Sequence, residues 1–325
     1  MGEITEDRWA AATGALRTAV AAGDPILLVC HVNPDGDALG SMLAVGQALR
    51  KLGATKVQAT YPGPSALPEP FLVLPGLDLL VDSPEAPVLM VTLDAAAESR
   101  LGAYASLLGE VPTIVLDHHA SYTGFGDIPL VDSGAAATAV VAAELISRLG
   151  VPLDLQIAEC LYIGVITDTG SFKYALTTPE VHRLAADLLE TGLDPGEISS
   201  RVFDTRPFGA VKLYGEVLSR AVLEPENRLV WSAASLADLE RHGQAPYVLE
   251  GLIDGIRCAA EADVACLLKQ VGPAEWSVSM RSRGGVDLSR VAVALGGGGH
   301  RAAAGFTGYG TPAEIMDRIR IALGE

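Results

Sequence analysis

The sequence predicts an α/β protein in which a mostly parallel sheet with helices on both faces is followed by a smaller α/β domain. Short apolar runs alternate with helical patterns over the first part of the chain, as expected for strands of a parallel sheet. The chain of 325 residues is also longer than one hydrophobic core usually supports. We therefore expect a first domain at 1–195, a linker at 196–220 and a second domain at 221–325.

The elements follow from hydrophobic periodicity and from turn residues. In the first domain, the pattern predicts strands at 26–30, 56–60, 88–93 and 113–116, and helices at 6–22, 38–52, 99–108, 135–149, 154–166 and 178–192. In the second domain, it predicts strands at 229–232, 264–269 and 276–281, followed by a glycine-rich loop at 296–299.

The formal net charge of -17 restricts the class of ligand. Proteins that grip a long phosphate backbone normally present a basic surface, so extended duplex nucleic acid is excluded as a partner. A small anionic substrate remains compatible with this charge, because bound divalent cations invert the local potential.

Cysteine spacing and hydropathy indicate a reducing compartment. None of the four cysteines forms a CxxC pair, and we expect buried free thiols at Cys30, Cys160, Cys258 and Cys266. The N-terminal segment lacks the features of a secretory signal, and no apolar stretch is long and uncharged enough to span a membrane. These features predict a cytoplasmic protein without a membrane partner.

Carboxylates and histidines cluster directly after three predicted strands. Because ligands of such sheets gather beyond the carboxyl ends of the strands, we expect these side chains to meet there. Carboxylate oxygens and imidazole nitrogens suit Mn²⁺, and a pair of such ions is the usual clamp for phosphoryl chemistry. The candidates are His31, Asp35, Asp37, Asp94, Asp117, His118, His119 and Asp168.

Single members of this set also have purely structural explanations. Asp35 and Asp37 suit a turn and a helix cap, and Asp168 suits a helix end. Asp117, His118 and His119 are harder to explain in this way, since all three are polar and follow an apolar strand. Acidic and imidazole groups crowded at one sheet edge would be desolvated without cations, which favours a metal site.

Five segments resemble motifs of the DHH superfamily of phosphoesterases with a C-terminal DHH-associated domain. The resemblance lies in HVNPDGDALGS at 31–41, the segment around Asp94, DHH at 117–119, TDTGSF at 167–172 and GGGGHRAAAGF at 296–306. It is strongest to the NrnA-like branch, the bacterial oligoribonucleases and pAp phosphatases, some of which degrade cyclic di-AMP or pApA. In the segment after Asp94, alanines stand where the family often keeps small polar residues.

The resemblance implies specific roles for these residues. One Mn²⁺ would be held by His31, Asp35 and Asp94, and a second by Asp37, Asp94, His118 and Asp168, with Mg²⁺ or Co²⁺ as substitutes. His119 would bind the scissile phosphate or assist protonation of the leaving oxygen, and Asp117 would orient the histidines. In the second domain, across an active-site cleft, the substrate anchors would be Arg281, Gly298, Gly299 and His300.

The activity that the resemblance implies is two-metal hydrolysis of short nucleotides to nucleoside monophosphates. Substrates would be pApA, cyclic di-AMP, pAp and RNA of a few nucleotides, and the enzyme would be a homodimer. Two alternatives remain open: an inorganic pyrophosphatase of the same superfamily, and a non-catalytic cyclic-dinucleotide sensor. The glycine-rich segment favours nucleotides over pyrophosphate, and the complete set of expected ligands favours an enzyme over a sensor.

Overall fold

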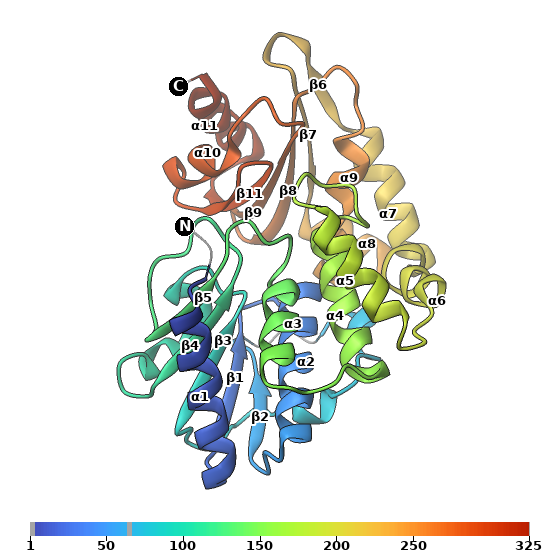
Figure 1. Cartoon of the computed structure of the whole chain (residues 1–325). Helices are drawn as coiled ribbons and strands as arrows, with labels where there is room; N and C mark the ends of the chain where they lie inside the picture. The colour runs from blue at the N-terminus through green and yellow to red at the C-terminus, as the bar shows by residue number, and fades with distance from the viewer. Residues whose placement is uncertain (1–3, 64–66, 325) are drawn as a thin grey trace. The chain divides into compact units, whose positions relative to one another are not determined.

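The computed structural model describes residues 4–63 and 67–324. The chain divides into two compact units, with the boundary between Asp204 and Thr205. In Figure 1, the first unit runs from blue to yellow-green and the second from yellow to red. Each unit is built around a β-sheet, and we describe the two units separately.

The first unit contains a five-stranded parallel sheet in the order β2-β1-β3-β4-β5. Its central strands are buried along their whole length, which explains their uninterrupted apolar sequences. The edge strand β5 is absent from the prediction, because it is short and contains Pro129, which is tolerated at an edge. The bounds are β1 Ile26–Cys30, β2 Val57–Thr60, β3 Leu89–Leu93, β4 Thr113–Asp117 and β5 Ile128–Val131.

Helices of this unit share one large core with one face of the sheet. Its other face packs against η3 (Glu98–Leu107), a 3₁₀ segment where the periodicity predicts an ordinary helix. That segment is interrupted at Gly102, whose φ of 53° is incompatible with a regular helix. The α-helices are α1 Glu6–Ala22, α2 Gly36–Leu52, α3 Thr138–Arg148, α4 Leu155–Asp168, α5 Pro179–Leu189 and α6 Pro195–Ser199.

Glycines allow α2 and α4 to pack closely. A Cβ added to Gly40 of α2 would overlap the carbonyl oxygen of Cys160 in α4. A Cβ added to Gly164 of α4 would lie 2.7 Å from the Cβ of Ala139 and 2.8 Å from Oδ1 of Asp37. Because α2 begins and α4 ends beside the carboxyl ends of the strands, this packing determines where Asp37 and Asp168 lie.

The second unit contains a six-stranded mixed sheet in the order β10-β11-β9-β8-β7-β6. One face packs on α7, α8 and α9, and the opposite face packs on α10 and α11. The strands are β6 Val222–Glu224, β7 Leu229–Ala234, β8 Val264–Gly272, β9 Glu275–Ser282, β10 Gly298–His300 and β11 Ala303–Tyr309. The helices are α7 Phe208–Ser219, α8 Leu236–His242, α9 Leu252–Ile256, α10 Leu288–Ala294 and α11 Pro312–Gly324.

The α/β fold class is confirmed, and two local expectations need correction. The predicted linker 196–220 contains most of α6, a π-helical turn η4 (Ser200–Asp204) and the whole of α7. Helix α7 forms because Ala210, Leu213 and Val217 are buried in a core of the second unit. The predicted glycine loop is in part strand β10, since 298–300 pair with β11.

The remaining elements are short. The 3₁₀ turns are η1 Glu69–Phe71, η2 Leu77–Leu79, η5 Pro225–Asn227 and η6 Pro246–Leu249. Cys30, Cys160 and Cys266 are buried, but the expected burial of Cys258 is wrong. That residue follows the last turn of α9, and its thiol is exposed while donating to the carbonyl of Asp254.

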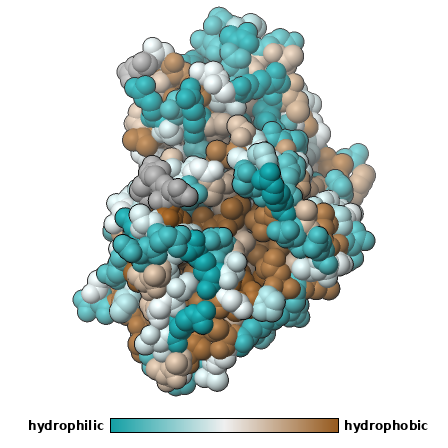
Figure 2. Space-filling view, in the orientation of Figure 1, coloured by the Kyte–Doolittle hydropathy of each residue, from teal (hydrophilic) through white to brown (hydrophobic). Residues whose placement is uncertain are grey.

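On the face drawn in Figure 2, hydrophobic residues gather over the middle of the first unit, with hydrophilic residues around them. Among residues 4–63 and 67–324, no helix is both long and apolar enough to cross a membrane.

Replacing Gly40 with alanine tests the close packing of α2 on α4. We expect Gly40→Ala to lower the free energy of unfolding by about 1–3 kcal/mol, because the added methyl must displace the backbone of α4. Gly14→Ala is the matched control: a Cβ there, within α1, meets no atom within 4 Å. The control should stabilise by up to about 1 kcal/mol. Urea denaturation measures both, and equal midpoints for the two variants would contradict the packing argument.

Candidate metal centre

The predicted residues of the first unit converge at the carboxyl edge of the parallel sheet. Three strands, β1, β3 and β4, end side by side there, and the first turn of α2 and the last turn of α4 lie beside them. The residues at these ends are His31 after β1, Asp35 and Asp37 at the start of α2, Asp94 after β3, Asp117, His118 and His119 at the end of β4, and Asp168 at the end of α4.

Asp35 combines its two predicted roles. Its Oδ1 caps α2 by accepting the backbone N–H groups of Asp37 and Ala38, at 3.1 and 3.0 Å. Its Oδ2 lies 3.8 Å from Nε2 of His31. One oxygen thus holds the helix terminus while the other faces the imidazole, so a capping role does not compete with a ligand role.

Asp94 lies between the two histidine groups. Its Oδ2 is 3.4 Å from Nε2 of His31, and its Oδ1 is 3.6 Å from Nε2 of His118. The residue is buried and has a φ of 59°, a left-handed conformation that aspartate tolerates better than most residues. Asn33, Ala96 and Ser171, all near the same edge, also have positive φ, and such backbone strain concentrates at functional sites.

Backbone carbonyls orient the two buried histidines. Nδ1 of His31 lies 2.8 Å from the carbonyl oxygen of Val32, and Nδ1 of His118 lies 3.2 Å from that of Ala135. Because Nδ1–H donates to a carbonyl, Nε2 of each ring faces the carboxylates and, once deprotonated, would offer its lone pair to a cation there. Nε2 of His118 is also 3.0 Å from Oδ2 of Asp168.

These side chains form three groups that share Asp94, one of them with Asp117 and His119, and two of the groups contain the predicted ligand sets. In each group, one ligand atom per residue lies within 4.8 Å of the others, and no sulfur is present. Oxygen and imidazole donors at such spacing fit borderline divalent cations. These two groups are His31, Asp35 and Asp94, and Asp37, Asp94 and His118, with Asp168 beside the second.

The electrostatics of the buried groups fit a cation site. Burial and the charges of Asp94 and Asp168 hold the pKa of Asp37 well above its usual range. Burial lowers the pKa of His31, but Asp35 and Asp94 outweigh burial and raise it to about 9. Likewise the carboxylates, Asp168 foremost, overcome burial and raise the pKa of His118. The pKa of about 9 leaves His31 protonated at neutral pH, so a divalent cation bound there would replace its proton, and the donor set fits such a cation.

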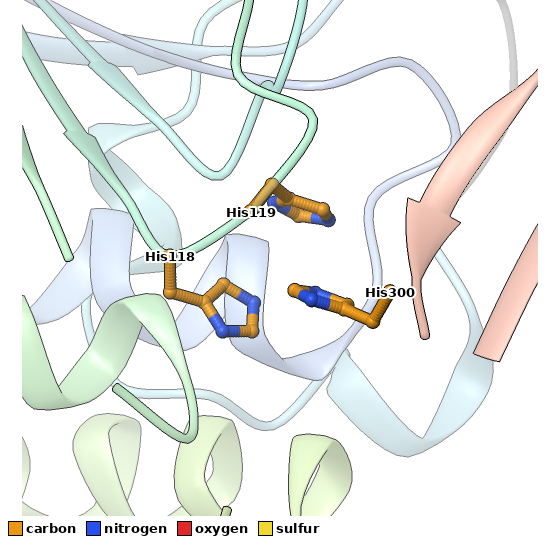
Figure 3. Close-up of side chains that lie close together, drawn as sticks. All are labelled: His118, His119 and His300. Atoms are coloured by element: carbon orange, nitrogen blue, oxygen red, sulfur yellow. The ribbon is translucent and has the colours of Figure 1, made fainter. Parts of the chain in front are cut away.

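Both carboxylate oxygens of Asp117 accept hydrogen bonds from neighbouring residues. Its Oδ1 accepts the backbone N–H of His119 at 2.8 Å and lies 2.7 Å from Nδ1 of that ring. Its Oδ2 accepts the backbone N–H of Ala96 at 2.6 Å. Figure 3 shows the His118 and His119 rings on the turn after β4, and their centroids are 4.8 Å apart. This geometry supports the predicted orienting role of Asp117 toward His119.

Thr138, the first residue of α3, is absent from the sequence-based set. Its backbone N–H donates to Oδ2 of Asp37 at 2.6 Å, and its hydroxyl donates to Oδ1 of Asp94 at 2.8 Å. The N–H of Ala139 donates to Oδ1 of Asp37 at 2.8 Å. The positive end of α3 therefore supports two carboxylates of the centre. The sequence offers only a weak signal, a hydroxyl residue near the start of the predicted helix 135–149.

The four predicted substrate anchors lie in the second unit. Arg281 on β9 pairs with Ala303 of β11, and Ala303 pairs with His300 of β10, the residue labelled in Figure 3. Arg281 and His300 therefore stand on one sheet face, about 10 Å apart across two strand spacings. In the described part of the chain, Nε of Arg281 is buried without a hydrogen-bond partner. Gly298 and Gly299 precede His300, and a Cβ on Gly299 would lie 2.6 Å from Cα of Ala304.

Thr138→Val tests the support that α3 gives to Asp94. The variant keeps the shape of the side chain and the backbone N–H but loses the hydroxyl that donates to Asp94. We expect Mn²⁺ affinity to fall about tenfold, as for other residues that orient metal ligands. Isothermal titration measures this, with Thr18→Val on the surface of α1 as the control. Identical affinities of the two variants would show that the hydroxyl has no role.

The raised histidine pKa values predict the pH dependence of cation binding. A cation must displace the proton of His31, whose pKa is about 9, so protonation opposes binding at neutral pH. Apparent Mn²⁺ affinity should rise with pH, by about tenfold per unit for each proton displaced, between about pH 6.5 and about pH 8.5. Titration calorimetry in buffers of different ionisation enthalpy counts the released protons. A Mn²⁺ affinity that does not change with pH, together with no release of protons, would contradict binding at His31.

Comparison with known proteins places both units in one family. The model of the DHH family, N-terminal domain, matches residues 25–165, and that of the DHHA1 domain matches residues 236–323. The "Bifunctional oligoribonuclease and PAP phosphatase NrnA" of Thermus thermophilus is 36% identical over 87% of this chain and 84% of its own length. The protein of the same name from Bacillus subtilis is 28% identical over 88% of this chain and 90% of its own length.

Among solved structures, an exopolyphosphatase-related protein from Bacteroides fragilis is 24% identical and superposes with a TM-score of 0.85, over 100% of this chain and 98% of its own. This likeness shows the fold. The family models and the identity to the Thermus thermophilus protein show more: the chain belongs to the NrnA-like DHH phosphoesterases and is a hydrolytic enzyme.

Proposed function

We propose that this enzyme hydrolyses phosphate esters in short nucleotides, namely pAp, pApA, cyclic di-AMP and oligoribonucleotides of a few residues, and releases nucleoside monophosphates. The observation that carries the proposal is the position of Asp94, whose two oxygens face two separate groups of ligands. Such a shared carboxylate is what a two-metal site for phosphoryl transfer requires. The names of the Thermus thermophilus and Bacillus subtilis relatives support the substrate class.

The first unit would hold two Mn²⁺ ions. His31, Asp35 and Asp94 would bind one ion, and Asp37, Asp94, His118 and Asp168 the other. When bound, the ions supply a nucleophilic water at neutral pH and neutralise the phosphate oxygens. The mixed carboxylate and imidazole donors favour Mn²⁺ over Mg²⁺, which prefers oxygen ligands alone.

His119 would serve as a phosphate-binding or proton-donating residue. Its Nδ1 is held 2.7 Å from Oδ1 of Asp117, which fixes the orientation of the ring. Nε2–H on the other side of the ring would then donate to a phosphate oxygen or to the departing oxygen. Arg281 and His300 of the second unit would bind a further phosphate of the nucleotide.

A substrate panel tests this function. Purified enzyme with Mn²⁺ is incubated separately with pAp, pApA, cyclic di-AMP, a short oligoribonucleotide and inorganic pyrophosphate, and products are separated by chromatography. We expect AMP from at least one adenine nucleotide and no turnover of pyrophosphate. Cleavage of pyrophosphate alone would contradict the proposal. Tight binding of cyclic di-AMP without hydrolysis of any compound would instead indicate a sensor.

Asp94→Asn tests the shared carboxylate. The amide keeps the shape but removes the negative charge between the two ions, so we expect kcat to fall by about 10³-fold or more. The variant should remain folded, because the substitution reduces the electrostatic repulsion among the buried carboxylates. Asp187→Asn on the exposed side of α5 is the control and should retain full activity. Full activity of purified Asp94→Asn would rule out this mechanism.

A further inference from the structure

Arg100 lies at the carboxyl end of β1, next to the metal centre. It belongs to η3, and its backbone carbonyl accepts the N–H of Val32, the neighbour of His31, at 3.0 Å. Its own N–H donates to the carbonyl of Ala97 at 3.0 Å. A Cβ added to Gly102, two residues further on, would lie 2.5 Å from Cβ of Pro62, so this turn has little room to move. The backbone of Arg100 is therefore fixed relative to His31.

The guanidinium of Arg100 is half-buried and has no hydrogen bond or ion pair within residues 4–63 and 67–324. Five other arginines of the same unit are engaged: Arg17 with a carbonyl, and Arg50, Arg148, Arg183 and Arg201 with carboxylates. Arg8 of α1 also has no side-chain partner in the described part of the chain, but it lies at the exposed start of its helix. An unpaired arginine beside a group of aspartates is unexpected, because each would stabilise the other by contact.

The side chain of Arg100 makes no ion pair with the nearby predicted ligands His31, Asp35 and Asp94, although its backbone is hydrogen-bonded beside His31. Cations bound at the carboxylates would leave this unpaired fork of N–H donors next to the centre.

We propose that Arg100 binds substrate, its guanidinium donating hydrogen bonds to a non-bridging phosphate oxygen at the His31 end of the centre. This inference rests on the proposed function and adds to it a phosphate contact from the first unit. The planar fork suits phosphate better than the ammonium of lysine does. The guanidinium would not itself help to bind the metal ions, because its positive charge repels them.

The test compares Arg100→Ala, Arg100→Gln and Arg100→Lys with wild type. At saturating Mn²⁺ we expect kcat/KM for pAp or pApA to fall about 10- to 100-fold in the alanine and glutamine variants, with partial recovery in the lysine variant. The inhibition constant of inorganic phosphate should rise by a similar factor. Arg183→Ala, which removes an exposed arginine paired with Glu180, is the matched control and should behave as wild type.

Mn²⁺ affinity separates this role from a structural one. Removing a positive charge beside a cation site should leave Mn²⁺ binding unchanged or tighter, as measured by isothermal titration. Weaker Mn²⁺ binding that accounts for the lost activity, or unchanged phosphate inhibition in Arg100→Ala, would overturn the inference. If wild type hydrolyses none of the nucleotides, the proposed function fails. In that case, direct titration of the Mn²⁺-loaded protein with phosphate, in wild type and in Arg100→Ala, tests the phosphate-binding role of Arg100 separately.

Discussion

The carboxylate of Asp94 is the interaction on which the site depends. It is buried at the end of the central strand β3, with one oxygen toward His31 and the other toward His118 and the hydroxyl of Thr138. Without cations, burial and neighbouring charges hold the pKa of Asp37 well above its usual range, and the carboxylates raise the pKa of His31 to about 9. The folded chain thus maintains a concentration of desolvated charge that bound divalent ions would neutralise.

Close packing and backbone hydrogen bonds hold these charged side chains in place. Gly40 and Gly164 bring α2 and α4 together, which places Asp37 and Asp168 beside the strand ends. The start of α3 donates two backbone N–H groups to Asp37. The left-handed φ of Asp94 turns its side chain at the end of β3. The helix packing, the N–H groups of α3 and the left-handed φ of Asp94 each restrict the conformation of the chain. Together they would preorganise the ligands before any ion binds.

The sequence predicts the parts of this arrangement that depend on periodicity. Buried strands such as β1 and β3, and the helix α2, agree closely with their apolar patterns. The short edge strand β5 carries too little pattern to be recognised, and the pattern of η3 predicts an ordinary helix without the interruption at Gly102. The sequence does not indicate Thr138 or Arg100 for another reason. Each is brought to the site by a hydrogen bond between segments distant in sequence, which only the folded backbone creates.

The most direct test of a carboxylate shared between two ions is anomalous diffraction from crystals grown with Mn²⁺. The account predicts two anomalous peaks at the carboxyl edge of the parallel sheet, each within bonding distance of a different oxygen of Asp94, with His31 at one ion and His118 at the other. A single peak, or two peaks that Asp94 does not join, would contradict it.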